Sequence, residues 1–159
     1  FDDPRRSDYT PLVITLFYRP PELLMGTTTY GPEVDIWSVG CIFAELITRE
    51  QLFVGNGEID QLSKIFSVLG PPSEDNWTGF SKLKHANALR WPGPKRSRLR
   101  EKFPANMFEG KTFLAPNGFR LLESMLSLDP AKRVTAEAAV GDDYFSEAPP
   151  PSDVRWNWD

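Results

Sequence analysis

The most continuous apolar pattern in the chain covers residues 33–48 and predicts a long helix. Pro32 stands where the first turn begins. Glu33 and Asp35 follow it, where the positive end of a helix dipole favours carboxylates. A helix that is apolar on every side is expected in the middle of a domain. Apolar residues occupy every side of this one: Val34, Ile36, Trp37, Val39, Cys41, Ile42, Phe43, Leu46 and Ile47.

Three further helices are predicted from shorter patterns. The first is an amphipathic, peripheral helix over Glu58–Leu69, because apolar residues recur there at spacings of three and four until Gly70 ends the pattern. Another apolar stripe covers residues 117–126 and stops before an Asp-Pro pair. Thr135 is placed to cap a short alanine-rich helix that ends at Val140.

The remaining segments predict loops. Residues 12–18 are rich in β-branched and aromatic side chains, as in a strand, but no partner strand follows, so we expect a loop packed on a helical base. Residues 73–116 are irregular and rich in glycine, proline and tryptophan, which is typical of a long surface insertion. We therefore predict a mainly α fold, with residues 1–147 forming a domain and residues 148–159 an extended tail.

Composition narrows the class of protein further. The chain has 159 residues, 40% of them hydrophobic, which is enough for one real core. Its formal net charge of −4 gives no electrostatic case for nucleic acid or membrane partners. Cys41 is the single cysteine and His85 the single histidine, so neither a disulfide nor a zinc site is expected. We expect a soluble, intracellular protein of the nucleus or cytoplasm.

Several stretches resemble protein kinases. Residues 9–22 resemble the end of a kinase activation segment, which closes with an A-P-E motif, and residues 35–41 resemble the start of the central helix of the C-terminal lobe. Residues 52–55 and 58–62 look like the cyclin-dependent branch, and residues 128–133 look like the late arginine motif of the same lobe. They occur in family order and at family spacing. The chain therefore resembles a C-terminal lobe fragment of a cyclin-dependent kinase, with the PITSLRE-type branch most similar.

The resemblance implies roles for residues of the substrate platform. Thr10 takes the place of the activating phosphoacceptor. Arg19 matches an arginine that draws the carbonyl at the Ile14 position away from the substrate, which favours proline after the target residue because proline has no N–H to leave unpaired. Thr15 matches a threonine that hydrogen-bonds the catalytic aspartate and lysine. Without the resemblance, Thr10 is an ordinary surface threonine, and the other three are packing or surface residues.

The resemblance also implies structural roles. Glu22 and Arg133 are expected to form a buried ion pair between the activation segment and the late helices; otherwise they are two unrelated exposed charges. Asp35 matches an aspartate that accepts N–H groups from the catalytic loop, and a first-turn carboxylate on a helix dipole is compatible with that role. The chain departs from the family at Pro20, where an alanine is usual, and at Phe17, where a tryptophan is usual.

The motifs of phosphoryl transfer are absent from the sequence. It contains no G-x-G-x-x-G, V-A-I-K, H-R-D or D-F-G. We therefore expect ATP and magnesium, a cyclin-like regulatory subunit and protein substrates with Ser/Thr-Pro to belong to the full-length kinase, and we expect this chain alone to be inactive. The absent catalytic loop should also leave the central helix exposed around Trp37 and Ile42. The alternative is a non-catalytic kinase remnant that binds a docking protein at Glu58–Leu69.

Overall fold

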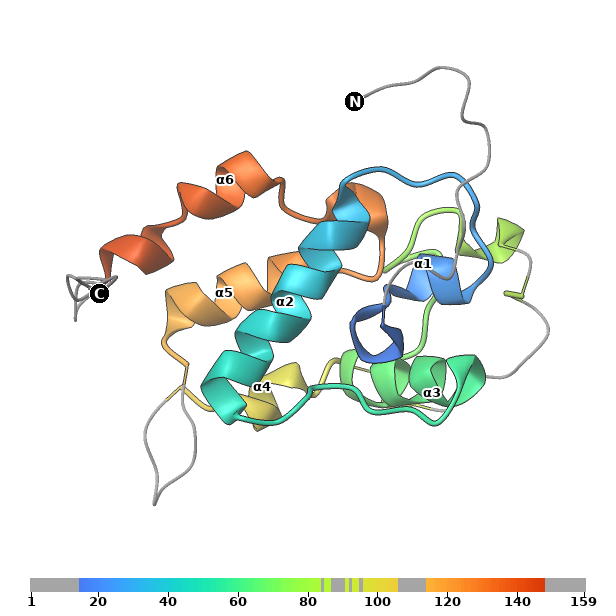
Figure 1. Ribbon diagram of the computed structural model, residues 1–159, viewed down its shortest axis with the longest axis horizontal. Helices are drawn as coiled ribbons and strands as arrows, with labels where there is room; N and C mark the ends of the chain where they lie inside the picture. Colours follow the sequence, from blue (N-terminus) through green and yellow to red (C-terminus); the bar gives the residue numbers. More distant parts are fainter. Residues whose placement is uncertain are drawn as a thin grey trace, which may run out of the picture.

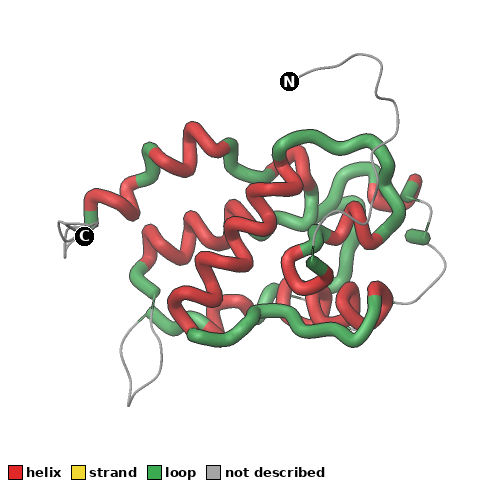
Figure 2. The backbone as a smooth tube through the Cα atoms, in the orientation of Figure 1, coloured by secondary structure: helices red, strands yellow, loops and turns green. Residues whose placement is uncertain are grey.

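The computed structural model describes residues 15–83, 85–86, 91, 93–94, 96–105 and 114–147. Within these ranges all regular structure is helical, which confirms the mainly α prediction (Figure 2). Thr10, Ile14 and the tail at residues 148–159 lie outside the described residues. The elements in chain order are η1 Leu16–Tyr18, α1 Pro21–Leu24, α2 Glu33–Thr48, α3 Glu58–Leu69, η2 Phe80–Lys82, α4 Leu99–Lys102, α5 Pro116–Met125, η3 Pro130–Lys132, α6 Ala136–Val140 and η4 Asp143–Ser146.

Helix α2 crosses the middle of the molecule, with α5 beside it and α1 and α3 to one side (Figure 1). Trp37 is fully buried and stacks on Phe53 with ring centroids 5.9 Å apart. Gly40 brings α5 close, because a Cβ at that position would lie 3.0 Å from side-chain atoms of Met125 and Leu126. The core therefore forms between α2 and elements on both sides of it in the chain, since Leu24 of α1 and Met25 belong to the same cluster.

One face of α2 is not covered by the described residues. Val39 is 50% exposed, Ile42 47% and Leu46 70%, and their spacing of three and four places them in a row along the helix. The helix lies in the middle of the described elements, as predicted, and one of its sides is exposed. The exposed face includes Ile42, as expected, but not Trp37, whose ring is in the core. A helix that is apolar all round cannot show from sequence which side its neighbours cover.

The segment between α3 and α5 contributes to the core. Trp77 and Phe80 are buried, and Leu99 and Phe103 have no exposed surface. A backbone hydrogen bond of 2.6 Å from the N–H of Arg98 to the carbonyl of Val68 ties the start of α4 to α3. The prediction of a surface insertion was therefore wrong for these residues, since isolated aromatic side chains anchor the segment without a helical period.

The helix boundaries follow the local sequence. Helix α3 has the predicted bounds, and it ends at Gly70, whose φ of 90° suits a residue without a Cβ. The Oγ1 of Thr135 accepts a hydrogen bond of 3.2 Å from the N–H of Ala138, as predicted for the cap of α6. Leu16–Tyr18 forms a 3-10 turn instead of a strand. No helix in the described part of the chain is long and apolar enough to span a bilayer.

Candidate functional site

A bidentate polar contact joins Glu22 of α1 to Arg133, which follows η3. The Nη1 and Nη2 atoms of Arg133 donate to Oε1 and Oε2 of Glu22, each at 2.6 Å. The two residues are 3% and 7% exposed. This is the buried ion pair expected from the sequence. Its two parallel hydrogen bonds fix the relative orientation of two segments that are 111 positions apart.

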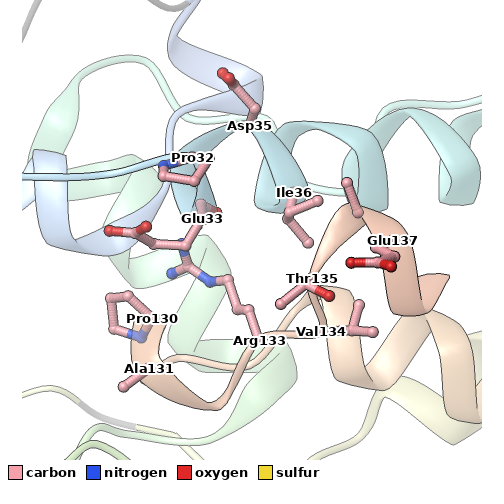
Figure 3. Close-up of a pocket in the computed structure, with 11 residues that line it drawn as sticks. Pro32, Glu33, Asp35, Ile36, Pro130, Ala131, Arg133, Val134, Thr135 and Glu137 are labelled. Atoms are coloured by element: carbon pink, nitrogen blue, oxygen red, sulfur yellow. Dashed lines mark hydrogen bonds between the residues drawn. The ribbon is translucent and has the colours of Figure 1, made fainter. Parts of the chain in front are cut away.

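Arg133 also holds the start of α2. Its Nη1 donates to the carbonyl of Glu33 at 3.0 Å, its Nε donates to the carbonyl of Ser127 at 2.9 Å, and its guanidinium lies 5.1 Å from the centre of the Trp37 ring. Figure 3 shows the Arg133 side chain reaching the first turn of α2 beside Glu33. One arginine therefore joins the platform at Glu22 to the central helix and to the η3 turn.

The environment of Glu22 acts on its charge in two opposing ways. Burial raises the pKa of its carboxyl group, and the hydrogen bonds and positive charge of Arg133 lower it. The shift is upward. A buried carboxylate of this kind depends on its partner, because removing the arginine would leave an unpaired charge in the core.

Arg19 is the second buried cation of the platform. Its side chain is 8% exposed, and its Nη1 donates to Oε1 of Glu58 at 2.8 Å; the Glu58 side chain is 54% exposed. Glu58 is the first residue of α3. Thr15 lies exposed just before η1. Of the residues assigned to substrate binding, Thr15 and Arg19 flank this turn, and Ile14 lies outside the described residues.

Sequence reasoning missed the role of Gln61, which is fully buried. Its Nε2 donates to the carbonyls of Phe17 and Phe53 at 3.4 and 3.3 Å, and its Oε1 accepts from the N–H of Gly55 at 2.8 Å. A Cβ at Gly55 would lie 2.4 Å from the backbone nitrogen of Gln61, so this close approach of the two backbones requires glycine. A polar residue adjoining the apolar stripe of α3 was the available signal.

Tyr18 attaches the same turn to α2. Its hydroxyl donates to Oε2 of Glu45 at 2.8 Å, and its carbonyl accepts from the hydroxyl of Ser38 at 3.0 Å. The pKa of Tyr18 is raised, mainly by the hydrogen bond to Glu45 and to a lesser extent by burial. The residues of η1 are therefore held by α2 on one side and by α3 on the other.

A second missed residue is Asp129, which is 4% exposed. Its carboxylate accepts the N–H of Thr78 and the N–H of Ala131, both at 3.1 Å. Burial works against the ionised form, but these N–H donors outweigh it and hold the pKa of Asp129 below its ordinary value. Asp129 thereby ties the loop after α3 to the η3 turn that carries Arg133.

Asp35 occupies the rim of a pocket of about 550 Å³ at the start of α2. The pocket has apolar walls from Ile36, Pro130, Ala131 and Val134. Asp35 is exposed, and Figure 3 shows its carboxylate directed away from Arg133. Its expected contacts with a catalytic loop stay a prediction.

Comparisons with known proteins show the family of the chain. The family model for the protein kinase domain matches residues 3–145. The chain belongs to the protein kinase family. It is 52% identical to cyclin-dependent kinase G1 of Arabidopsis thaliana over 143 residues, which cover 90% of this chain and 23% of that protein. Cyclin-dependent kinase 11A of Homo sapiens is 43% identical over 91% of this chain and 18% of its own length.

A solved structure supports the same assignment. The yeast RNA Pol II CTD kinase CTDK-1 complex contains a chain that is 35% identical, with a TM-score of 0.81 over 93% of this chain and 47% of that chain. The resemblance to a cyclin-dependent kinase lobe is therefore confirmed, with PITSLRE-type kinases among the relatives. The chain spans about a fifth of the length of these two curated relatives and about half of the solved kinase chain.

The described residues do not by themselves provide a site for ATP or magnesium. Among them, no group of three or more His, Cys, Asp or Glu side chains is arranged to hold a metal ion. The carboxylates of Glu22 and Asp129 are taken up by Arg133 and by N–H groups of the chain. Binding of ATP or magnesium is therefore not assigned to these side chains.

Proposed function

We propose that this chain is part of a proline-directed serine/threonine protein kinase of the cyclin-dependent type. In the whole protein, the reaction would be transfer of the terminal phosphoryl group of ATP, with magnesium, to a Ser or Thr that precedes proline. A cyclin-like subunit would activate it. The observation that carries the proposal is the buried Glu22–Arg133 pair, which lies within the matched kinase region and holds the platform segment to the lobe.

Some platform residues hold the segment in place, and others are proposed to set which substrate it binds. Glu22 and Arg133 fix the end of the segment, while Tyr18 and Gln61 fix η1 against α2 and α3. In the proposed role, Arg19 hydrogen-bonds the carbonyl of Ile14, so this carbonyl cannot accept the N–H of the substrate residue that follows the target. Proline has no N–H and therefore leaves no donor unpaired there. Phosphate on Thr10 would order the segment before these residues.

The exposed row on α2 is consistent with a lobe that has further neighbours. Val39, Ile42 and Leu46 form an apolar face, with Asp35 at its N-terminal end. We propose that the catalytic loop and the helix before it pack on this face in the whole kinase, where Asp35 would accept the loop's N–H groups. The 159-residue chain alone is accordingly proposed to be inactive.

A second candidate function is supported by the surface of α3. Ile59 is 54% exposed and Val54 is 47% exposed, close to the first turn of that helix. Exposed apolar side chains on a peripheral helix and in the segment before it suit a docking protein, either on the whole kinase or on a non-catalytic remnant. Cys41 is a free, buried thiol, which supports placing the protein in the reducing nucleus or cytoplasm.

A chimeric kinase that carries this lobe distinguishes the kinase proposal from the non-catalytic remnant. Residues 3–145 would replace the matched segment of Arabidopsis cyclin-dependent kinase G1, which is 52% identical. Assayed with the cyclin of that host, the chimera is expected to phosphorylate Ser-Pro peptides, and the 159-residue chain is expected to be inactive. A chimera that folds and binds ATP but transfers no phosphate would overturn the kinase proposal and leave the binding module.

A further inference from the structure

The carboxylate of Glu58 lies where it can set the direction of the Arg19 side chain. We propose that Glu58 is a positioning residue for Arg19, and that it thereby sets how strictly the kinase requires proline after the target residue. This rests on the proposed function. Glu58 belongs to the cyclin-dependent motif and to the predicted docking helix, but nothing in its local sequence points to Arg19, which is 39 positions away.

The geometry of the pair favours control of orientation. Arg19 Nη1 and Glu58 Oε1 are 2.8 Å apart, the length of a charge-assisted hydrogen bond. A guanidinium is planar and its N–H groups form a rigid fork, so fixing one nitrogen limits the directions open to the others. Because the Arg19 side chain is 8% exposed, water has little access to replace the carboxylate. Glu58 therefore restricts where the remaining N–H groups of Arg19 point.

Helix α3 holds Glu58 in a fixed place relative to η1. Gln61 lies one turn further along α3 and bonds the carbonyl of Phe17, two residues before Arg19. Leu62 and Ile65 of the same helix have no exposed surface. The carboxylate thus projects from a helix that is itself attached to the turn ending at Arg19, which is the arrangement needed to position a side chain.

The alternative is an ordinary surface ion pair that only adds stability. Exposed pairs contribute little to stability, and Glu58 is 54% exposed. The chain supplies a matched control: Arg98 Nε and Glu101 Oε2 also lie 2.8 Å apart, with both side chains more than half exposed and away from the platform. A stability role predicts similar small effects at Glu58 and Glu101, whereas a positioning role predicts an effect on specificity at Glu58 alone.

The test measures kcat/KM of the chimera for a Ser-Pro peptide and for the matched Ser-Ala peptide. Because a hydrogen bond between charged groups is at stake, Glu58→Ala is expected to lower the Pro/Ala ratio by about tenfold. Glu58→Gln keeps an acceptor oxygen and is expected to restore most of the ratio. Glu101→Ala is expected to leave it unchanged. An unchanged ratio in Glu58→Ala, or an equal loss of activity on both peptides, would overturn the proposal.

A second measurement separates this inference from the proposed function. In the 159-residue chain, nitrogen NMR of the Arg19 guanidinium is expected to show distinct Nη signals, because the bond to Glu58 restricts rotation. Glu58→Ala is expected to merge them, and Glu101→Ala to leave them distinct. If the wild-type chimera transfers no phosphate, the kinase proposal fails, and the NMR result still decides whether Glu58 positions Arg19. Averaged signals in the wild-type chain would contradict the positioning role.

Discussion

Arg133 links three parts of the molecule through one side chain. It bonds Glu22, the carbonyl at the start of α2 and the carbonyl of Ser127, and its guanidinium faces Trp37. Each of its three nitrogens donates to an acceptor, as buried polar groups normally do. Losing Arg133 would leave the carboxylate of Glu22 unpaired in the core.

Replacing Arg133 by methionine is expected to lower the free energy of unfolding by roughly 3–5 kcal/mol, because a buried charge loses its partner. The double variant Glu22→Met with Arg133→Met should lose less, since no unpaired charge remains. Urea unfolding of the three proteins measures the difference. Lys132→Ala is the control, because that side chain is 51% exposed and its polar contacts are long, 3.5 Å to Asp129 Oδ2 and 3.4 Å to the carbonyl of Asp75. Equal losses in the single and double variants would contradict the account.

Asp129 predicts a pH dependence. Its folded-state pKa is below the ordinary value of 3.8, so the ionised form stabilises the fold at higher pH. This stabilisation is lost as the pH falls from 3.8 through the folded pKa. We expect the difference in unfolding free energy between wild type and Asp129→Asn to be constant near neutral pH and to shrink below 3.8. A difference that grows on acidification would show that another group dominates.

The elements could be predicted from sequence to different degrees. Helix α3 was placed with its bounds because its apolar period is regular and Gly70 ends it. The surface prediction is wrong for Trp77, Phe80 and Phe103, because single aromatic residues are buried there without a period that marks them. For α2 the bounds followed from the pattern, but its exposed face depends on the neighbours that pack against it.

The exposed row on α2 predicts self-association of the isolated chain. Ile42→Lys with Leu46→Glu is expected to reduce association in sedimentation velocity while leaving unfolding nearly unchanged, because these side chains are 47% and 70% exposed. Val140→Lys is the control, since Val140 is 77% exposed on α6, away from the row. A wild-type chain that stays monomeric at high concentration would contradict this role for the α2 row.

At the scale of the whole molecule, some contacts between residues distant in sequence could be predicted and others could not. The Glu22–Arg133 pair was expected because family motifs lie at both ends of the chain. Glu58 and Gln61 belong to a recognised motif, yet their contacts with Arg19 and Phe17 depend on how α3 packs beside η1. Side-chain partners so distant in sequence leave no local pattern, so they emerge only from the fold.

The central claim is that Arg19, held on this platform, makes the kinase prefer proline after its target residue. The most direct measurement is the ratio of kcat/KM for Ser-Pro and Ser-Ala peptides in the chimera carrying residues 3–145, with and without Arg19→Ala. We predict a strong preference for Ser-Pro in the unmodified chimera and a loss of at least about tenfold in the ratio with Arg19→Ala. An active chimera with no preference for proline, or one whose preference survives Arg19→Ala, would contradict the account.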